Sequence, residues 1–208
     1  MSNRGPIITL LAVAALAAVL VGLNVTATGT TVIQEPTSVP SPTVVQQASY
    51  AGRTSGNEAT IAIAVRDGQA AAYVCDGRRV EAWLQGTLEG GRLAVQNPRK
   101  ASATGTVEGD AIFGTVSVNG NQWPYSAQLA SPPAGLYQGS ATVAGVPNRI
   151  GWIVLPDGSQ TGIRKSRDGL VGPAPPLDPR TLRGVIVDGV QIDPQRVEGD
   201  TRVVRPPS

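Results

Sequence analysis

Two-residue turn signals recur at short intervals from residue 50 onward, and they restrict the fold more than any other feature of the sequence. Each pairs Gly with Asp, Asn or a second Gly, which are the residues that adopt the positive φ angles of tight hairpin turns. They are Asp67-Gly68, Asp76-Gly77, Gly90-Gly91, Gly109-Asp110, Asn119-Gly120 and Asp157-Gly158. This spacing leaves room for short strands but not for ordinary helices, so it predicts a series of antiparallel hairpins.

The segments between these turns alternate apolar and polar residues with a period of two. Residues 60–66 place Ile61, Ile63 and Val65 on one face of a strand, and residues 79–85 alternate in the same way. Further strand-like runs lie at 92–96, 102–107, 111–118, 122–129, 135–143, 149–155 and 160–165. We therefore predict an all-β fold, an antiparallel meander that hides its edges by closing as a barrel or a barrel-like sandwich.

One hairpin pattern occurs twice in the chain. The stretch AIAVRDGQAAAYV at residues 62–74 is matched by WIVLPDGSQTGIR at residues 152–164, with Asp-Gly at the same offset. A Tyr-x-Gly sequence precedes each copy, at Tyr50 and Tyr137. Because Asp-Gly is suited to a type I′ turn, the repeat predicts a recurring hairpin unit and not a catalytic loop used twice.

The amino-terminal segment predicts a membrane anchor. Residues 7–25, IITLLAVAALAAVLVGLNV, are almost entirely apolar, and as a helix they would span roughly 28 Å, enough to cross a bilayer. Arg4 precedes the segment and the next charge is Glu35, so the positive-inside rule leaves the rest of the chain outside the cytoplasm. We expect residues 1–25 to form one uncleaved transmembrane helix in the cell membrane; the alternative is a signal peptide whose cleavage would release a secreted protein.

Composition divides the remainder of the chain into three parts. Residues 26–48 are rich in Thr, Ser, Pro and Gln, with too few large apolar side chains to offset the entropy of ordering, and predict an extended stalk. Residues 49–168 hold the strands and form the expected extracytoplasmic β domain. Residues 169–208 contain a Pro-rich run, a short hairpin around Asp188-Gly189 and a polar end. We expect this last part to dock on the β domain as a strap with a loose tail.

The residue types restrict the chemistry of the chain. It has no histidine and a single cysteine, Cys75, so it can form no Ser-His-Asp or Cys-His arrangement, no intramolecular disulfide and no thiolate metal cluster. It also lacks a P-loop, a G-x-S-x-G or S-x-x-K pattern and a calcium loop. We therefore expect no enzyme activity, no cofactor and no metal. Cys75 is interpreted as a small core residue, and an exposed thiol forming an intermolecular disulfide is the alternative.

The charged residues of the sequence do not form the broad basic field that a nucleic-acid partner requires. The 17 basic and 15 acidic residues give a net charge of +2 and are spread along the chain, so we expect no nucleic-acid partner. The adjacent Arg78 and Arg79 are candidates for contact with an anionic envelope component. Solvation of two loop arginines is the alternative interpretation.

Two aromatic residues are the other candidates for contact with a ligand or partner. Trp83 alternates with Glu81 and Gln85, which places it on the polar face of its strand, and Tyr73 belongs to the neighbouring run. An aromatic pair on such a face can form a binding platform, while ordinary packing under the carboxyl-terminal strap is the alternative. Three further aromatic residues have apolar surroundings typical of a core: Trp123, Tyr125 and Trp152.

At AYVCDGRRVEAWLQG, PAGLYQG and GWIVLPDGSQTG the sequence resembles a group of uncharacterised actinobacterial membrane-anchored envelope proteins with a β-rich outer domain. The resemblance covers about residues 50–170 and implies an envelope location, but no catalytic or binding residue. We expect a membrane-tethered extracytoplasmic β domain that serves as a non-catalytic binding or structural module, with an envelope protein or polymer as its partner. The alternatives are a carrier of a small apolar ligand in a barrel lumen, and a secreted enzyme or enzyme inhibitor.

Overall fold

The computed structural model describes residues 46–178, 180–181 and 185–202. The chain divides into two units, residues 1–40 and 41–208, and all the described residues belong to the second. The predicted anchor at residues 1–25 and most of the predicted stalk at 26–48 therefore lie outside the described residues. Within the described part of the chain, no helix is both long enough and apolar enough to span a bilayer.

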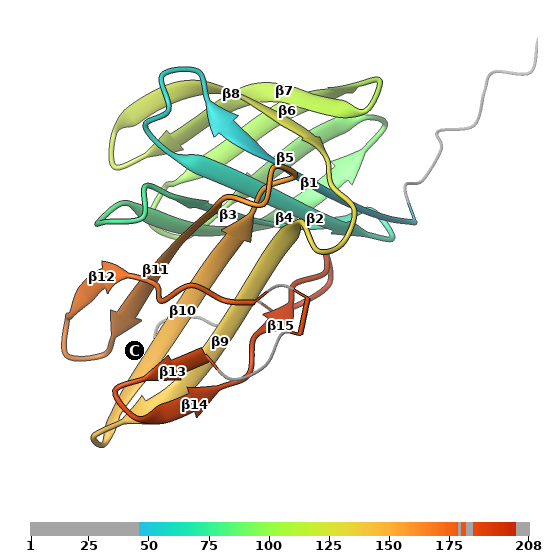
Figure 1. The fold of residues 1–208 in the computed structure, drawn as a ribbon. Coiled ribbons are helices and arrows are strands. Elements are labelled where there is room, and N and C mark those ends of the chain that lie inside the picture. Colours follow the sequence, from blue (N-terminus) through green and yellow to red (C-terminus); the bar gives the residue numbers. More distant parts are fainter. Residues whose placement is uncertain (1–45, 179, 182–184, 203–208) are drawn as a thin grey trace, which may run out of the picture. The chain divides into compact units, whose positions relative to one another are not determined.

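The first eight strands form a closed antiparallel barrel, in which each strand pairs with the next and β8 pairs back with β1 (Figure 1). The all-β prediction is thus confirmed, and of the two predicted forms of closure the structure contains the barrel. The barrel strands are β1 (Gln47–Thr54), β2 (Thr60–Arg66), β3 (Gln69–Cys75), β4 (Glu81–Glu89), β5 (Arg92–Gln96), β6 (Ser102–Glu108), β7 (Ala111–Val118) and β8 (Asn121–Leu129).

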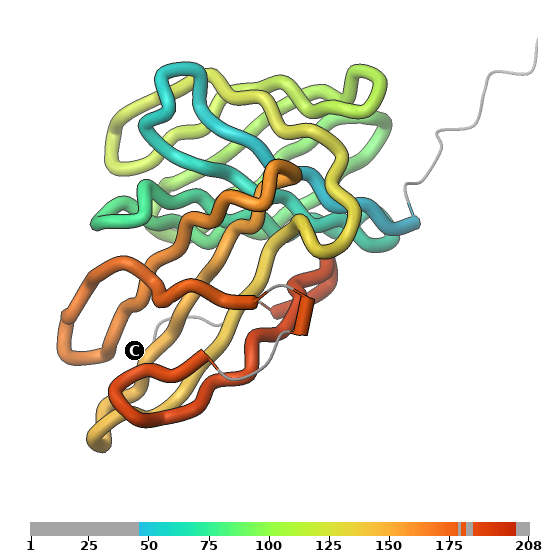
Figure 2. Tube along the Cα trace, in the orientation of Figure 1, coloured from blue at the N-terminus to red at the C-terminus, as the bar shows by residue number. Residues whose placement is uncertain are grey.

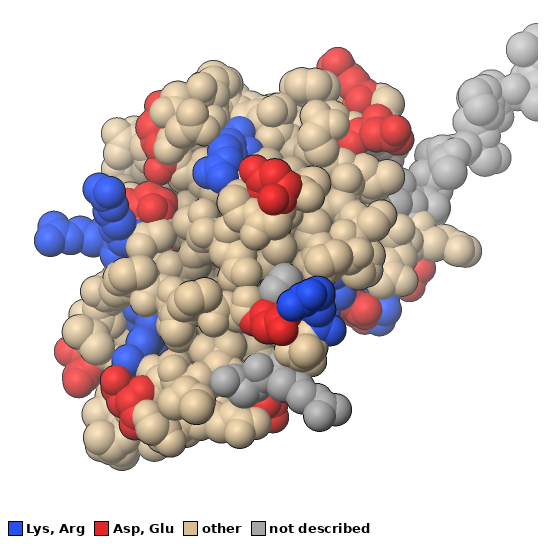
Figure 3. All heavy atoms as spheres, in the orientation of Figure 1, with Lys and Arg blue, Asp and Glu red and all other residues tan. Residues whose placement is uncertain are grey.

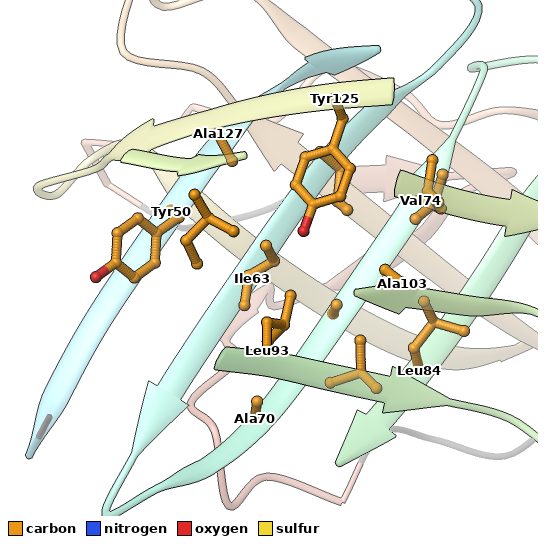
Figure 4. Close-up of a cluster of buried hydrophobic side chains, with 14 of the residues drawn as sticks. Tyr50, Ile63, Ala70, Val74, Leu84, Leu93, Ala103, Tyr125 and Ala127 are labelled. Atoms are coloured by element: carbon orange, nitrogen blue, oxygen red, sulfur yellow. The ribbon is translucent and has the colours of Figure 1, made fainter. Parts of the chain in front are cut away.

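Alternate side chains of the barrel strands point into the lumen and form one buried cluster. Ile61, Ile63 and Val65, which the sequence places on one face, all belong to this cluster, as do Leu84 and Tyr125. Figure 4 shows side chains of this cluster, among them Ile63, Leu84 and Tyr125, converging from strands on different sides of the lumen. The lumen is therefore occupied by side chains, as is common in barrels of eight strands.

The strands that follow form a second, separate sheet in the order β12-β11-β10-β9-β15. The sequence analysis assigned all the strands to one barrel or sandwich, whereas only the first eight close. The connection from β8 to β9 contains Pro132 and Pro133, which have no N–H to donate and so cannot extend the ladder of the barrel. The strands of the second sheet are β9 (Gly135–Val143), β10 (Val146–Val154), β11 (Gln160–Ser166), β12 (Val171–Pro173) and β15 (Gln195–Arg196).

One face of the second sheet covers the outer surface of the first barrel strands. Leu136, Ile153 and Ile163, from β9, β10 and β11, share a buried cluster with outward-facing alanines such as Ala62 and Ala71. The tube in Figure 2 follows the chain from the barrel into this sheet through the 130–134 connection. Small side chains on the barrel let the two sheets interdigitate at close range.

The opposite face of the second sheet is covered by residues from the predicted strap. The hairpin of β13 (Val185–Val187) and β14 (Val190–Ile192) packs with Leu177 on Tyr137 and Trp152 of the sheet. The Trp152 indole Nε1 donates to the Pro175 carbonyl at 2.7 Å. This part of the strap therefore docks on the second sheet, and β12 joins that sheet as its edge strand.

The last described residues, 195–202, connect the second sheet to the barrel. Val197 lies in the interface between them, and Glu198 forms an ion pair with Arg66 of β2. Gly199 lies directly against the β2–β3 hairpin, because a Cβ there would come within 2.1 Å of the Gln69 carbonyl oxygen. Only glycine allows this approach, which brings the carboxyl-terminal segment against the outer surface of the barrel.

The two copies of the repeated hairpin use different turns. Asp67 and Gly68 have φ angles of 49° and 78°, as the predicted type I′ turn requires. In the second copy the Gly158 N–H donates to the Leu155 carbonyl and the Leu155 N–H donates to the Ser159 carbonyl, both at 2.9 Å, which describes a three-residue loop. The prediction of a shared turn type is wrong here, because Gly158 has a positive φ of 81° but Asp157 does not. Pro156 would flank a two-residue type I′ turn, where it has no N–H to donate to the Ser159 carbonyl.

Candidate functional site

Tyr73 and Trp83, the predicted aromatic contacts, lie together between the barrel and the second sheet. They are paired across β3 and β4, and their rings stack with centroids 4.2 Å apart. Gly151 of β10 lies directly over them, since a Cβ at that position would come within 2.7 Å of both rings. Tyr73 is fully buried and Trp83 is 8% exposed, so a ligand would reach this pair only by separating β10 from the barrel.

Arg78 and Arg79 lie at the exposed tip of the β3–β4 hairpin. The Asp76 carboxylate accepts their backbone N–H groups at 2.7 and 2.8 Å, which shapes the turn and directs the chain around it. The structure therefore places the two arginines on the same hairpin as the aromatic pair but not in one site with it. Contact of these four residues with a ligand or partner stays a prediction.

A buried charged cluster lies beside the aromatic pair, and the sequence analysis missed it. Arg149 of β10 donates to the Glu81 carboxylate at 2.6 Å, and the side chains of both residues are less than 10% exposed. The Tyr73 hydroxyl donates to the same carboxylate at 3.2 Å, and the Lys165 ammonium lies 3.8 Å from it. Glu81 is thus held by two cations and a phenol, an arrangement that joins β10 and β11 of the second sheet to β4 of the barrel.

The environment of this cluster also affects the nearby titratable groups. Burial raises the pKa of Tyr73 well above its ordinary value, and the neighbouring Cys75 and Glu81 reinforce the effect. Burial likewise raises the pKa of Cys75 to about 11, and the thiol is fully buried. Because a disulfide forms through an accessible thiolate, this position favours the interpretation of Cys75 as a core residue.

Several of the aspartates that the sequence places beside glycine have structural partners in turns. Asp157 accepts hydrogen bonds from the Ser159 N–H at 2.8 Å and the Ser159 hydroxyl at 2.6 Å, and these bonds lower its pKa. A hydrogen bond from the Ser166 hydroxyl lowers the pKa of Asp168 in the same way. Among the described residues, no group of three or more Cys, Asp or Glu side chains is placed to hold a metal ion.

A pocket of about 400 Å³ opens where the barrel, the β8–β9 connection and the carboxyl-terminal segment meet. We call it the junction pocket. Its volume lies at the lower end of the range found for small-molecule sites. Strand β1 and strand β2 supply one wall, and the 129–132 and 196–198 segments supply the other. The lining residues are Gln47, Ala48, Ser49, Ala64, Val65, Leu129, Ala130, Ser131, Pro132, Arg196, Val197 and Glu198.

The junction pocket combines an apolar lining with a few polar groups. Leu129 is 47% exposed and lies with Pro132 and Val197 on the apolar part. Arg196 and Glu198 supply opposite charges, and Ser49 has a buried hydroxyl that makes no hydrogen bond with any described residue. The sequence analysis did not identify this pocket, since its walls come from segments more than 60 residues apart.

The barrel lumen is the site that the carrier hypothesis requires. It contains Tyr50 and Tyr125 among aliphatic side chains contributed by every barrel strand, and in Figure 4 the Tyr125 ring points inward. The Tyr125 hydroxyl is buried without a hydrogen-bond partner among the described residues, and burial strongly raises its pKa. A carrier function would require these side chains to move aside for a ligand.

Charged groups of both signs are interspersed on the face of the molecule shown in Figure 3, without a broad field of one sign. Comparison of the chain with protein-family models, curated proteins and solved structures gives no match. The resemblance to actinobacterial envelope proteins therefore stays a hypothesis, and the geometry of the described residues has to support any functional proposal alone.

Proposed function

We propose that this protein is a membrane-tethered extracytoplasmic module that binds an envelope component without catalysis, and that the junction pocket is its binding site. The pocket is the observation that carries the proposal. It combines concavity and apolar walls with polar groups in its lining, features that characterise small-molecule sites. The tether and the location rest on the apolar segment at residues 7–25 and on the charges that flank it.

Two features of the described residues support a role in binding over a role in catalysis. The buried carboxylate of Glu81 is engaged by Arg149 and Tyr73, and the exposed aspartates at 157 and 168 are engaged in turns. The one thiol is buried and protonated at neutral pH. These carboxylates are engaged in structural contacts and the thiol is protonated, which supports a role in binding.

The tether can be tested by expressing the full chain in a bacterial host. The protein should remain in the membrane pellet after alkaline carbonate treatment, and protease added to intact spheroplasts should digest its carboxyl-terminal part. A variant lacking residues 1–25 should be found in the soluble fraction of the cytoplasm. Recovery of the full chain as a soluble secreted species, shortened at its amino terminus, would overturn the tether and support the signal-peptide alternative.

The binding function can be tested by comparing the full-length protein with the variant Ser131→Trp, purified side by side in mild detergent. Ser131 is an exposed residue of the pocket lining, so a large indole there should fill the space without disturbing the core. Mass spectrometry should detect an envelope component that accompanies the wild-type protein and is depleted from the variant. Equal recovery of every component with both proteins would contradict a binding role for the pocket.

A further inference from the structure

We propose that the junction pocket binds a small carboxylic acid with an apolar body, whose carboxylate is received by Arg196 and Ser49. This inference rests on the proposed function and specifies the class of ligand that the pocket takes. Four properties of the pocket support it: a cation with no acidic partner among the described residues, a buried hydroxyl with no partner among them, an acidic residue that is already neutralised, and an apolar floor.

The Arg196 guanidinium is held in place by neutral contacts. Its Nη1 donates to the Tyr137 hydroxyl at 3.2 Å, and its Cζ lies 5.7 Å from the centroid of the Tyr137 ring. It also lies over Gly135, where a Cβ would approach Nη2 within 2.8 Å. Among the described residues no carboxylate lies within 4.0 Å of it. An ordered arginine with free N–H groups is the side chain best suited to bind a carboxylate.

Ser49 supplies a second polar group on the barrel side of the pocket. Tyr50 points into the lumen and Ala51 points toward the second sheet, so alternation along β1 directs Ser49 outward, toward the pocket. Its hydroxyl is buried and has no hydrogen-bond partner among the described residues. A buried hydroxyl without a partner is unfavourable, and a ligand oxygen would satisfy it.

Glu198 also lines the pocket, but its negative charge is already balanced. Arg66 forms an ion pair with one carboxylate oxygen of Glu198, and the Gln47 side-chain amide donates to the other at 3.3 Å. Among the described residues that line the pocket, the positive charge available to a ligand is therefore that of Arg196. A single guanidinium with Glu198 nearby favours a monoanion over a phosphate dianion, which would need more cationic groups.

The remaining lining determines the rest of the ligand. Leu129, which is 47% exposed, and the exposed Pro132 present apolar surface to the pocket, while Ala130 and Val197 are buried parts of its lining. An apolar body lying on these residues would remove this surface from water. The chemistry is that of a branched or aromatic carboxylic acid, which a free metabolite or the carboxyl terminus of a peptide could both provide.

The experiment measures binding of defined probes to the full-length protein in detergent micelles by ligand-observed NMR, with protein-free micelles as the blank. The probes are 4-methylpentanoate, representing a free acid, and N-acetyl-alanyl-leucine, representing a peptide terminus. Each is compared with its primary amide, which has the same shape without the charge. The acids should bind and the amides should bind at least tenfold more weakly, as expected for the loss of a charge-assisted hydrogen bond. Equal binding of acid and amide would overturn the proposal.

Variants then locate the site. Arg196→Gln should weaken acid binding about tenfold or more, while Arg92→Gln, a change of the same kind on an exposed residue of β5, should leave it unchanged. Ser49→Ala should weaken binding about fivefold and leave the free protein as stable as the wild type or more stable, because it removes the unpartnered hydroxyl. If Arg196→Gln does not fold, Ser49→Ala and Ser131→Trp decide the result. Unchanged binding in all the folded pocket variants would overturn the proposal.

The outcomes separate this inference from the function on which it rests. If the acids do not bind but an envelope component still accompanies the wild-type protein and not Ser131→Trp, the pocket is a binding site and the ligand class is wrong. If neither result is obtained, both proposals fail. Binding of N-acetyl-alanyl-leucine without 4-methylpentanoate would identify a peptide terminus as the source of the carboxylate.

Discussion

The outer surface of the barrel has two halves that differ in what covers them. Over β1 to β3 the outward positions are mainly small and apolar, and they are buried under the second sheet: Ala51, Ala62, Ala64 and Ala71. Over β5 to β8 the outward positions are exposed and largely uncharged: Ala94, Thr104, Thr106, Phe113, Thr115, Ser126 and Gln128. Both halves enclose the same kind of apolar lumen.

The two halves show that the alternating pattern of a strand predicts which residues point into the barrel. The pattern does not predict whether the outward residues are buried or exposed. The outer positions of β2 from Thr60 to Ala64 are buried like its inner positions, and this is the mark of a strand buried on both sides. The outer alanines bring the second sheet close, and Tyr73 and Trp83 fill the larger space opposite Gly151. We call the surface over β1 to β3 and the start of β4 the covered half, and the surface over β5 to β8 the open half. Substitutions in the covered half should therefore lower the stability of the protein more than matched substitutions in the open half.

The largest difference should come from removing Glu81. The variant Glu81→Ala takes away the carboxylate that accepts a hydrogen bond from Arg149 inside the covered half. We expect it to lower the free energy of unfolding by about 3–5 kcal/mol, the range for breaking a buried ion pair. The matched change Glu108→Ala, at an exposed position of β6, should alter it by less than about 0.5 kcal/mol. Urea unfolding followed by tryptophan fluorescence measures both, and similar losses in the two variants would break the comparison.

The second difference should come from enlarging an outward alanine. Ala71→Leu places extra methyl groups in the interface with the second sheet, where Ala71 is fully buried, and should lower stability by about 3 kcal/mol. Ala94→Leu makes the same change on the open half and should have an effect of less than about 0.5 kcal/mol. Thermal unfolding of the two variants checks this directly. A tolerated Ala71→Leu would mean that the second sheet does not pack closely on the barrel.

The third difference concerns alkaline pH. Burial raises the pKa of Cys75 from its ordinary value of 9.0 to about 11, so the folded state holds the thiol proton more tightly than the unfolded state. The resulting stabilisation is complete below about pH 9 and is lost as the pH rises through 11. At pH 11 the wild-type protein should have lost about 2 kcal/mol more stability, relative to pH 7, than Cys75→Ala. Urea unfolding between pH 7 and 11 provides the measurement.

A labelling control links this pH effect to burial. At pH 7.5 the native protein should not react with a thiol reagent, because its one thiol is buried. The double variant Cys75→Ala, Thr115→Cys carries its thiol on the open half and should react at once. Rapid labelling of native Cys75 would show that the covered half opens readily, and would revive the alternative of an intermolecular disulfide.

The smallest difference should come from the carboxyl-terminal segment. Glu198→Gln removes the ion pair with Arg66, whose side chain is about one third exposed, so we expect a loss of less than about 1 kcal/mol. The loss should diminish further at high salt because exposed charges are screened. Unfolding of the variant in low and high salt checks both points. A loss of several kcal/mol would show that residues 195–202 hold the second sheet on the barrel more strongly than their contacts indicate.

Much of the local structure was predictable from the sequence. The predicted strands agree closely with the structure, and β5 is identical at residues 92–96. The turn at Asp67-Gly68 has the predicted geometry, and the hairpin around Asp188-Gly189 forms between β13 and β14. The turn after Leu155 was predicted wrongly, since the Asp-Gly pattern was given more weight than the proline before it.

The candidate sites were less predictable. Trp83 was placed correctly on the outward face of β4, but its cover is Gly151 of β10, some 68 residues away in the sequence, and not the strap. Glu81 and Arg149 carry no pattern that marks them as partners, because ordinary surface strands also alternate charged with apolar residues. Neither Arg196 nor Ser49 stands out in the sequence, and only the meeting of β1 with the carboxyl-terminal segment puts them in one pocket.

The sequence by itself determined the strands, most of the turns and the inward face of each barrel strand, because each depends on neighbours within one hairpin. Its composition also excluded histidine-dependent chemistry and an intramolecular disulfide. The tertiary structure alone decided that eight strands close, that β9 to β12 form a second sheet with β15, which half of the barrel is covered, and where a pocket opens. These features depend on contacts between segments far apart in the chain. Such contacts leave no periodic pattern in the sequence, because they follow from the fit of side chains in space.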